Sequence, residues 1–82
     1  MELRLDALRP GERGYISRLE PDGDVTGRLE DLGFLPGTRV ECELLSPAGD
    51  PAAYRVRQAL IALRRRDASR VLVTVAAGEG ER

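Results

Sequence analysis

The stretch that decides the fold spans residues 25–40 and reads Val-Thr-Gly-Arg-Leu-Glu-Asp-Leu-Gly-Phe-Leu-Pro-Gly-Thr-Arg-Val. Val25, Leu29 and Leu32 fall at i, i+4 and i+7, which places their side chains on one face of a helix. The pattern predicts one short helix whose apolar face covers a small core. It leaves open whether this helix is only a lid or also a docking surface for a partner.

The end of the predicted helix carries its own signals. Gly33 follows the last periodic residue, where a left-handed residue is expected, and Phe34 would then contact Leu29 in a Schellman ending. Residues 35–38, Leu-Pro-Gly-Thr, suit a type II turn because proline fixes φ at the second position and glycine supplies a positive φ at the third. We expect a helix, a sharp stop and a tight turn that leads into a strand.

Length and charge narrow the class of protein. The chain has 82 residues, which indicates one domain. A chain of this size buries only about 60% of the surface of its unfolded form, so little room is left for a deep catalytic cleft. The net charge of −1 does not indicate a general nucleic-acid binder. The sequence shows no secretory signal and no apolar run near the ~20 residues of a membrane span, so we expect a cytoplasmic protein without direct membrane insertion.

Several residue types with chemical roles are missing. The sequence contains no His and no Lys, so all 13 basic residues are Arg. This removes the commonest general base, the commonest metal ligand and the lysine that a P-loop needs. Cys42 is the one cysteine, and its place between two glutamates in an apparent strand indicates a small core residue. We therefore expect no enzyme activity, no cofactor and no specific metal requirement for folding.

Five short segments of the sequence read as strands. They are, in chain order, residues 15–19, 38–45, 53–57, the segment around 59–63, and 70–75. With one short helix inserted between the first and second strands, this order predicts an all-β fold, a small five-stranded barrel. Tight connections among the last four strands favour an SH3-like barrel over an OB-fold. The domain is expected over residues 1–75, with a frayed tail over 76–82.

Strand alternation and the helix face together define an expected core. Its members are Leu8, Ile16, Leu29, Leu32, Val40, Leu44, Val56, Ile61, Leu63, Val71 and Val73.

A series of short motifs occurs in a fixed order along the chain. They are Leu8-x-Pro10-Gly11-x-x-Gly14-x-Ile16-x-x-Leu19, Arg28-Leu29-x-x-Leu32-Gly33-Phe34-x-Pro36-Gly37-x-x-Val40, Pro47-x-Gly49-Asp50-Pro51, Ile61-Ala62-Leu63-Arg64 and Ala68-x-x-Val71-x-Val73. In order and spacing, the chain resembles the FeoA family, cytoplasmic partners of the FeoB ferrous iron transporter. The resemblance extends over nearly the whole chain, from about residue 5 to residue 75.

The resemblance implies an SH3-like barrel and a role in ferrous iron uptake, through contact with the cytoplasmic part of a FeoB-type transporter rather than through chemistry of its own. Transition metal ion binding is a term attached to the family as a whole. The same barrel also occurs as the C-terminal domain of iron-dependent repressors. Because the sequence begins at Met1 directly before the domain, a free-standing protein is the favoured interpretation.

The sequence departs from the family pattern at one turn. Gln58 stands where the family usually has glycine, between the third and fourth strands. If the turn tolerates glutamine, Leu60 is exposed on the outer face and becomes a candidate contact. If the register shifts by one residue, Leu60 belongs to the core.

Two surfaces are candidates for binding. The first is the helix–turn segment, where Arg28, Asp31, Phe34 and Leu35 would combine an apolar centre with a polar edge. The second is a basic patch on the hairpin side, made of Arg55, Arg57, Arg64, Arg65 and Arg66.

The basic patch supports the alternative function, an anion- or nucleic-acid-binding barrel. A solvated face with weak ion pairs explains the same residues, and few aromatic side chains are present for stacking on bases. We therefore expect no nucleic-acid partner, and a weak homo-oligomer stays open.

Overall fold

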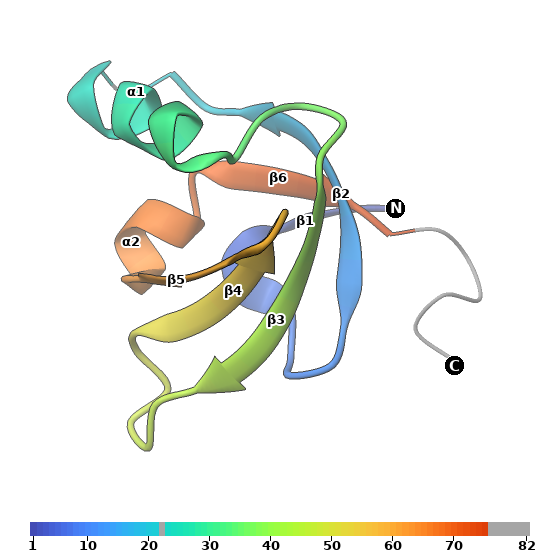
Figure 1. Cartoon of the computed structure of the whole chain (residues 1–82), viewed down its shortest axis with the longest axis vertical. Helices are drawn as coiled ribbons and strands as arrows, with labels where there is room; N and C mark the ends of the chain where they lie inside the picture. Colours follow the sequence, from blue (N-terminus) through green and yellow to red (C-terminus); the bar gives the residue numbers. More distant parts are fainter. Residues whose placement is uncertain (22, 76–82) are drawn as a thin grey trace.

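The computed structural model describes residues 1–21 and 23–75, so the tail predicted for residues 76–82 lies outside the described part of the chain. Within these residues six strands form one antiparallel sheet in the order β1-β6-β2-β3-β4-β5. Their bounds are β1 Glu2–Arg4, β2 Arg13–Leu19, β3 Arg39–Leu45, β4 Ala52–Val56, β5 Ala59–Leu63 and β6 Val71–Thr74. Figure 1 shows the sheet curling around the core.

Three short helical elements complete the fold. They are the 3₁₀ turn η1 (Leu5–Ala7), the helix α1 (Gly23–Leu32) and the short helix α2 (Arg65–Ala68). The helix α1 follows β2 and precedes β3, and it lies on the same side of the molecule as α2 (Figure 1). The five predicted strands and the inserted helix are therefore present, within a few residues of their predicted bounds.

The strand count predicted from the sequence was wrong by one, because β1 was missed. This strand has only three residues, and it is defined by pairing with β6 near the other end of the chain, with Leu3 opposite Val73. Its last residue, Arg4, donates hydrogen bonds to the Glu20 carboxylate at 2.9 Å and to the Ser69 carbonyl at 2.6 Å. The bond from Arg4 holds the pKa of Glu20 below its usual value. Such long-range pairing leaves no periodic pattern in three residues.

The end of α1 is the predicted Schellman motif. The Phe34 N–H donates to the Leu29 carbonyl at 3.0 Å, and the Gly33 N–H donates to the Glu30 carbonyl at 3.0 Å. Gly33 has a φ of +111°, which glycine adopts without the penalty that a Cβ atom brings. The local sequence signals were sufficient here, because every partner lies within five residues along the chain.

The predicted type II turn follows directly. The Thr38 N–H donates to the Leu35 carbonyl at 3.0 Å, and Gly37 has a φ of +89°. Two further bonds fix this turn to β2: the Gly37 N–H donates to the Ile16 carbonyl at 2.7 Å, and the Ile16 N–H donates to the Thr38 carbonyl at 2.9 Å. The corner between α1 and β3 is thus held at a defined position on the sheet.

Most of the predicted core is buried, but Leu32 and Leu44 are not. Leu32, the last residue of α1, is 42% exposed, because the chain reverses at Gly33 and places Phe34 in the core with 0% exposure. Leu44 is 52% exposed, because a β-bulge shifts the β3–β4 register between Cys42 and Leu44 and reverses the alternation beyond it. Ile61 is partly buried and packs against the core. The remaining predicted members are buried: Leu8, Ile16, Leu29, Val40, Val56, Leu63, Val71 and Val73.

The turn at Gln58 keeps the β4–β5 register unshifted. Val56 pairs with Ala59, so the turn contains only Arg57 and Gln58, and Arg57 takes the positive φ of +57°. Leu60 pairs with Arg55 and is half exposed on the outer face. Of the two alternatives left open by the sequence, the exposed position for Leu60 is the correct one.

Tyr54 gives the fold a testable dependence on alkaline pH. It lies in β4 with 2% exposure, and burial, followed by the nearby Cys42 and Asp6, raises the pKa of its phenol to about 12. Above pH 10 the unfolded chain loses a proton that the folded chain keeps, so stability is full below pH 10 and is lost as the pH rises toward 12. After a reduction for solvent screening, we expect the free energy of unfolding to fall by about 1–2 kcal/mol over this pH range.

Urea denaturation between pH 9 and 12 measures this effect. Tyr54→Phe removes the ionisable group and should flatten the decline, while Tyr15→Phe, at a 47% exposed position, should leave it unchanged. Burial also raises the pKa of the Cys42 thiol, so part of the decline will remain in Tyr54→Phe. Equal slopes in the wild type and in Tyr54→Phe would contradict the assignment of the decline to Tyr54.

Candidate functional site

We use the name corner surface for the exposed groups around the end of α1, namely Arg28, Asp31, Leu35 and Pro36. Arg28 and Asp31 are exposed on α1, as predicted, and Leu35 is partly exposed at the start of the turn. The Arg28 Nη2 atom lies 3.7 Å from Oδ2 of Asp67 in α2. Asp67 is shared with Arg66, which it also contacts at 3.7 Å. The ion pair between Arg28 and Asp67 is therefore weak, and 60% of the Arg28 side chain is exposed, so its guanidinium is accessible to a partner.

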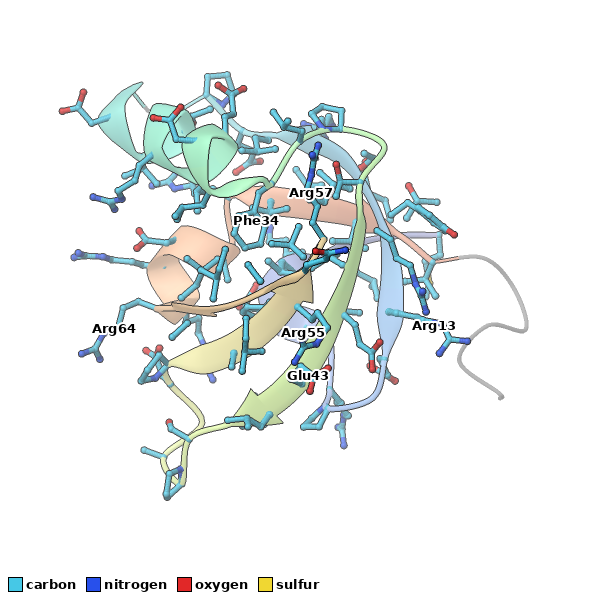
Figure 2. All side chains as sticks on the ribbon, viewed as in Figure 1. Arg13, Phe34, Glu43, Arg55, Arg57 and Arg64 are labelled. Carbon is cyan, nitrogen blue, oxygen red and sulfur yellow. The ribbon has the colours of Figure 1, made fainter. Side chains whose placement is uncertain are left out.

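Phe34 takes a different part from the one predicted. Its side chain is fully buried, and Figure 2 shows the ring directed into the interior below the corner. It cannot present its ring to a partner, so the prediction of Phe34 as a contact residue is corrected. Phe34 instead supports the corner surface from beneath.

The predicted basic patch divides into two regions. Arg55 lies on the outer side of β4 and Arg57 lies in the turn that follows it, and both line an open hollow together with Thr38, Arg39 and Glu41. Within this region the Arg55 Nε atom donates to Oε2 of Glu43 at 3.0 Å (Figure 2). Acidic side chains thus alternate with the arginines, which weakens the case for a phosphate-binding surface.

The other arginines lie at the far end of β5. Arg64 and Arg66 line a second hollow with Asp50, whose carboxylate accepts a hydrogen bond from the Arg65 backbone N–H at 2.9 Å. The predicted patch separates because α2 begins directly after β5 and turns the chain away from the outer face of β4.

The side chain of Arg57 approaches the end of α1, which the sequence did not indicate. A Cβ atom placed on Gly33 would lie 3.9 Å from Cδ of Arg57, so the Arg57 side chain extends beside the end of α1. There its positive charge suits the negative end of the helix dipole. The β3–β4 pairing of Val40 with Val56 is the signal that could have revealed it, because it brings this turn next to the corner.

The described residues contain no group of three or more His, Cys, Asp or Glu side chains that could hold a metal ion. Cys42 is fully buried, and desolvation, followed by the charges of Glu12, Glu43 and Glu41, raises the pKa of its thiol. A protonated thiol in the core is a packing residue rather than a nucleophile. In residues 1–21 and 23–75, no helix has the length and apolar character needed to cross a bilayer.

Comparison with known proteins places the chain in a family. A model described as the FeoA domain matches residues 3–75. The chain belongs to the FeoA family. It is 32% identical over 71 residues to a Fe(2+) transport protein A/Fe(2+) transporter FeoB fusion protein from Porphyromonas gingivalis. This alignment covers 87% of the chain and 8% of the much longer fusion protein.

Solved FeoA-family structures share the fold. Iron(II) transport protein A from Clostridium thermocellum is 36% identical, with a TM-score of 0.86 over 93% of this chain and 47% of that one. The zinc complex of FeoA from Stenotrophomonas maltophilia is 26% identical, with a TM-score of 0.78 over 94% and 93% of the two chains. That protein is described as a prokaryotic SH3 domain protein. The predicted SH3-like fold and FeoA membership are confirmed, and the family is linked to ferrous iron transport.

Proposed function

We propose that this chain is a cytoplasmic accessory protein of ferrous iron uptake that acts by direct contact with the cytoplasmic part of a FeoB-type transporter. The observation that carries the proposal is the P. gingivalis relative, in which an FeoA part and the FeoB transporter belong to one fusion protein. Fusion keeps two modules at a high effective concentration. Contact between the two parts requires a binding surface on the FeoA domain.

The corner surface is the best candidate for this contact. Leu35 offers a partly exposed apolar group, while Arg28 and Asp31 give the polar edge that small interfaces typically have. The two hydrogen bonds between Ile16 and the turn hold the corner in place before binding. A preorganised surface loses less conformational freedom on binding, which favours affinity.

Charge and polarity changes on the corner surface test the contact. In a pull-down with the cytoplasmic domain of FeoB, Leu35→Asp and Arg28→Glu are each expected to weaken binding about tenfold or more, because they remove the apolar centre or reverse a rim charge. Circular dichroism of both variants should remain native.

Arg9→Glu is the matched control for Arg28→Glu. Arg9 is an exposed arginine in the loop before β2, and the hydrogen bond from the Gly11 N–H to the Cys42 carbonyl places this loop beside the middle of β3, at the opposite end of β2 from the corner. The Arg9→Glu variant should bind as the wild type does. If both corner variants bind normally and charge reversal at Arg64, Arg65 and Arg66 abolishes binding, the docking surface is on the hairpin side and the assignment is wrong.

A further inference from the structure

The two edges of the sheet differ in how they are protected against pairing with another strand. The edge strand β1 has three residues, and two of them, Glu2 and Arg4, are charged. The opposite edge strand, β5, has five residues, Ala-Leu-Ile-Ala-Leu, with no charge, proline or bulge. Short length and charge are the features that usually block an edge, so β1 is blocked and β5 is open.

The backbone of β5 has unused hydrogen-bonding groups. The pair that closes a two-residue hairpin turn, here Val56 and Ala59, exchanges both hydrogen bonds, and such pairs then alternate along an antiparallel ladder. Ile61 and Leu63 therefore direct their N–H and C=O groups toward β4, and Leu60 and Ala62 direct theirs away from it. No strand within residues 1–21 and 23–75 pairs with this outer edge.

The side chains near this edge form an apolar surface with basic ends. Leu60 and Ala62 are both exposed on the outer face. Arg57 lies at the start of β5 and Arg64 at its end, and Figure 2 shows them at opposite ends of the strand. The next two residues, Arg65 and Arg66, are also exposed.

We propose that the open edge of β5 binds an extended segment of another protein as a seventh strand. The segment has about five uncharged, β-forming residues at its centre and acidic residues at both ends. The backbone groups of Leu60 and Ala62 supply the main-chain bonds that give such strand addition its affinity. Arginines at both ends of β5 supply the complementary charge. This inference goes beyond the transporter contact and does not depend on which protein carries the segment.

A second copy of this chain fits the edge poorly. In an antiparallel β5–β5 pair centred on Ile61, Arg57, in the turn before each strand, would lie near Arg64 and Arg65, which follow the strand of the other copy. In a parallel pair, the three arginines that follow β5 would lie side by side. Like charges placed opposite each other destabilise a strand pair, so either arrangement opposes self-association. An acidic segment turns the same charges into attractions.

The probe is a synthetic peptide, acetyl-Glu-Glu-Val-Thr-Val-Thr-Val-Glu-Glu-amide, added to the full chain labelled with ¹⁵N. The amides of Leu60 and Ala62 point away from β4, so their hydrogen exchange should slow at least tenfold at saturating peptide. The Ile61 amide, already directed at β4, should change less and serves as an internal control. A peptide with proline in place of the central valine, and one with lysine in place of every glutamate, should both fail to slow exchange.

A matched pair of variants tests whether the peptide binds at the edge of β5. Leu60→Glu places a negative charge at the edge and should weaken peptide binding about fivefold. Leu44→Glu is the control, because Leu44 is 52% exposed, as against 50% for Leu60, and lies in β3, two strands away from the β5 edge. The Leu44→Glu variant should bind the peptide as the wild type does.

Three results would overturn the proposal. One is unchanged exchange at Leu60 and Ala62 up to millimolar peptide. Another is equal protection by the proline or lysine peptide. The third is protection that rises with protein concentration in the absence of peptide, because the occupant of the edge would then be a second copy.

Discussion

Phe34→Ala is expected to lower the free energy of unfolding by about 3–5 kcal/mol, the usual cost of removing a buried aromatic side chain. Phe34 is 0% exposed and is among the largest fully buried side chains of the domain. The cavity left by the ring cannot collapse easily, because the corner above it is fixed to Ile16 by two backbone hydrogen bonds. A domain of this size has a total stability of about 5–15 kcal/mol, so the variant should be close to unfolding at 37 °C.

Urea denaturation followed by circular dichroism measures the loss. Phe34→Leu is the control, because it keeps most of the apolar volume and should cost less than about 1.5 kcal/mol. Comparing Phe34→Ala with Leu35→Asp distinguishes a residue that supports the corner surface from one that contacts the partner. Phe34→Ala should weaken partner binding only together with stability, whereas Leu35→Asp should weaken binding while the fold remains native. Normal stability of Phe34→Ala would show that the ring does not fill the space below α1.

The features predicted correctly from the sequence are those set by neighbouring residues. The Schellman ending at Gly33 and the turn at Gly37 involve bonds across at most five residues, and glycine at a positive φ marks each of them. The predictions failed where distant pairing decides the outcome. The bulge next to Leu44 depends on β4, and β1 depends on β6, so neither is visible in a local pattern.

The candidate site shows the same division. Exposure of Arg28 and Asp31 follows from helix periodicity, and both residues were placed correctly. The burial of Phe34 and the approach of Arg57 to Gly33 require knowledge of how β3, β4 and α1 meet. The separation of Arg64 from Arg55 requires knowledge of where α2 follows β5. The open edge of β5 likewise follows only from the strand order, although its uncharged sequence is plain in the chain.

Gly14 is expected to be the least replaceable glycine in the domain. A Cβ atom at this position would lie 2.6 Å from the Thr74 carbonyl oxygen and 2.6 Å from Cγ1 of Val73. Gly14 is buried in β2, where the curled sheet brings the backbone of β6 into the space that a side chain would occupy. The carbonyl oxygen belongs to the backbone and cannot rotate away, and moving it disturbs the pairing of Thr74 with Tyr15.

We therefore expect Gly14→Ala to lower the free energy of unfolding by about 1–3 kcal/mol, and the bulkier, β-branched Gly14→Val to lower it by about 3 kcal/mol or more. Gly27→Ala is the matched control, since Gly27 lies in α1 and no atom beyond its chain neighbours and the nearby helix backbone lies within 4 Å of an added Cβ. That change should raise the free energy of unfolding by about 0.5–1 kcal/mol, because alanine has a higher helix propensity than glycine. Thermal or urea denaturation of the three variants should thus give shifts of opposite sign for the same Gly→Ala exchange. A neutral Gly14→Ala would mean that β6 does not approach β2 as closely as the sheet register requires.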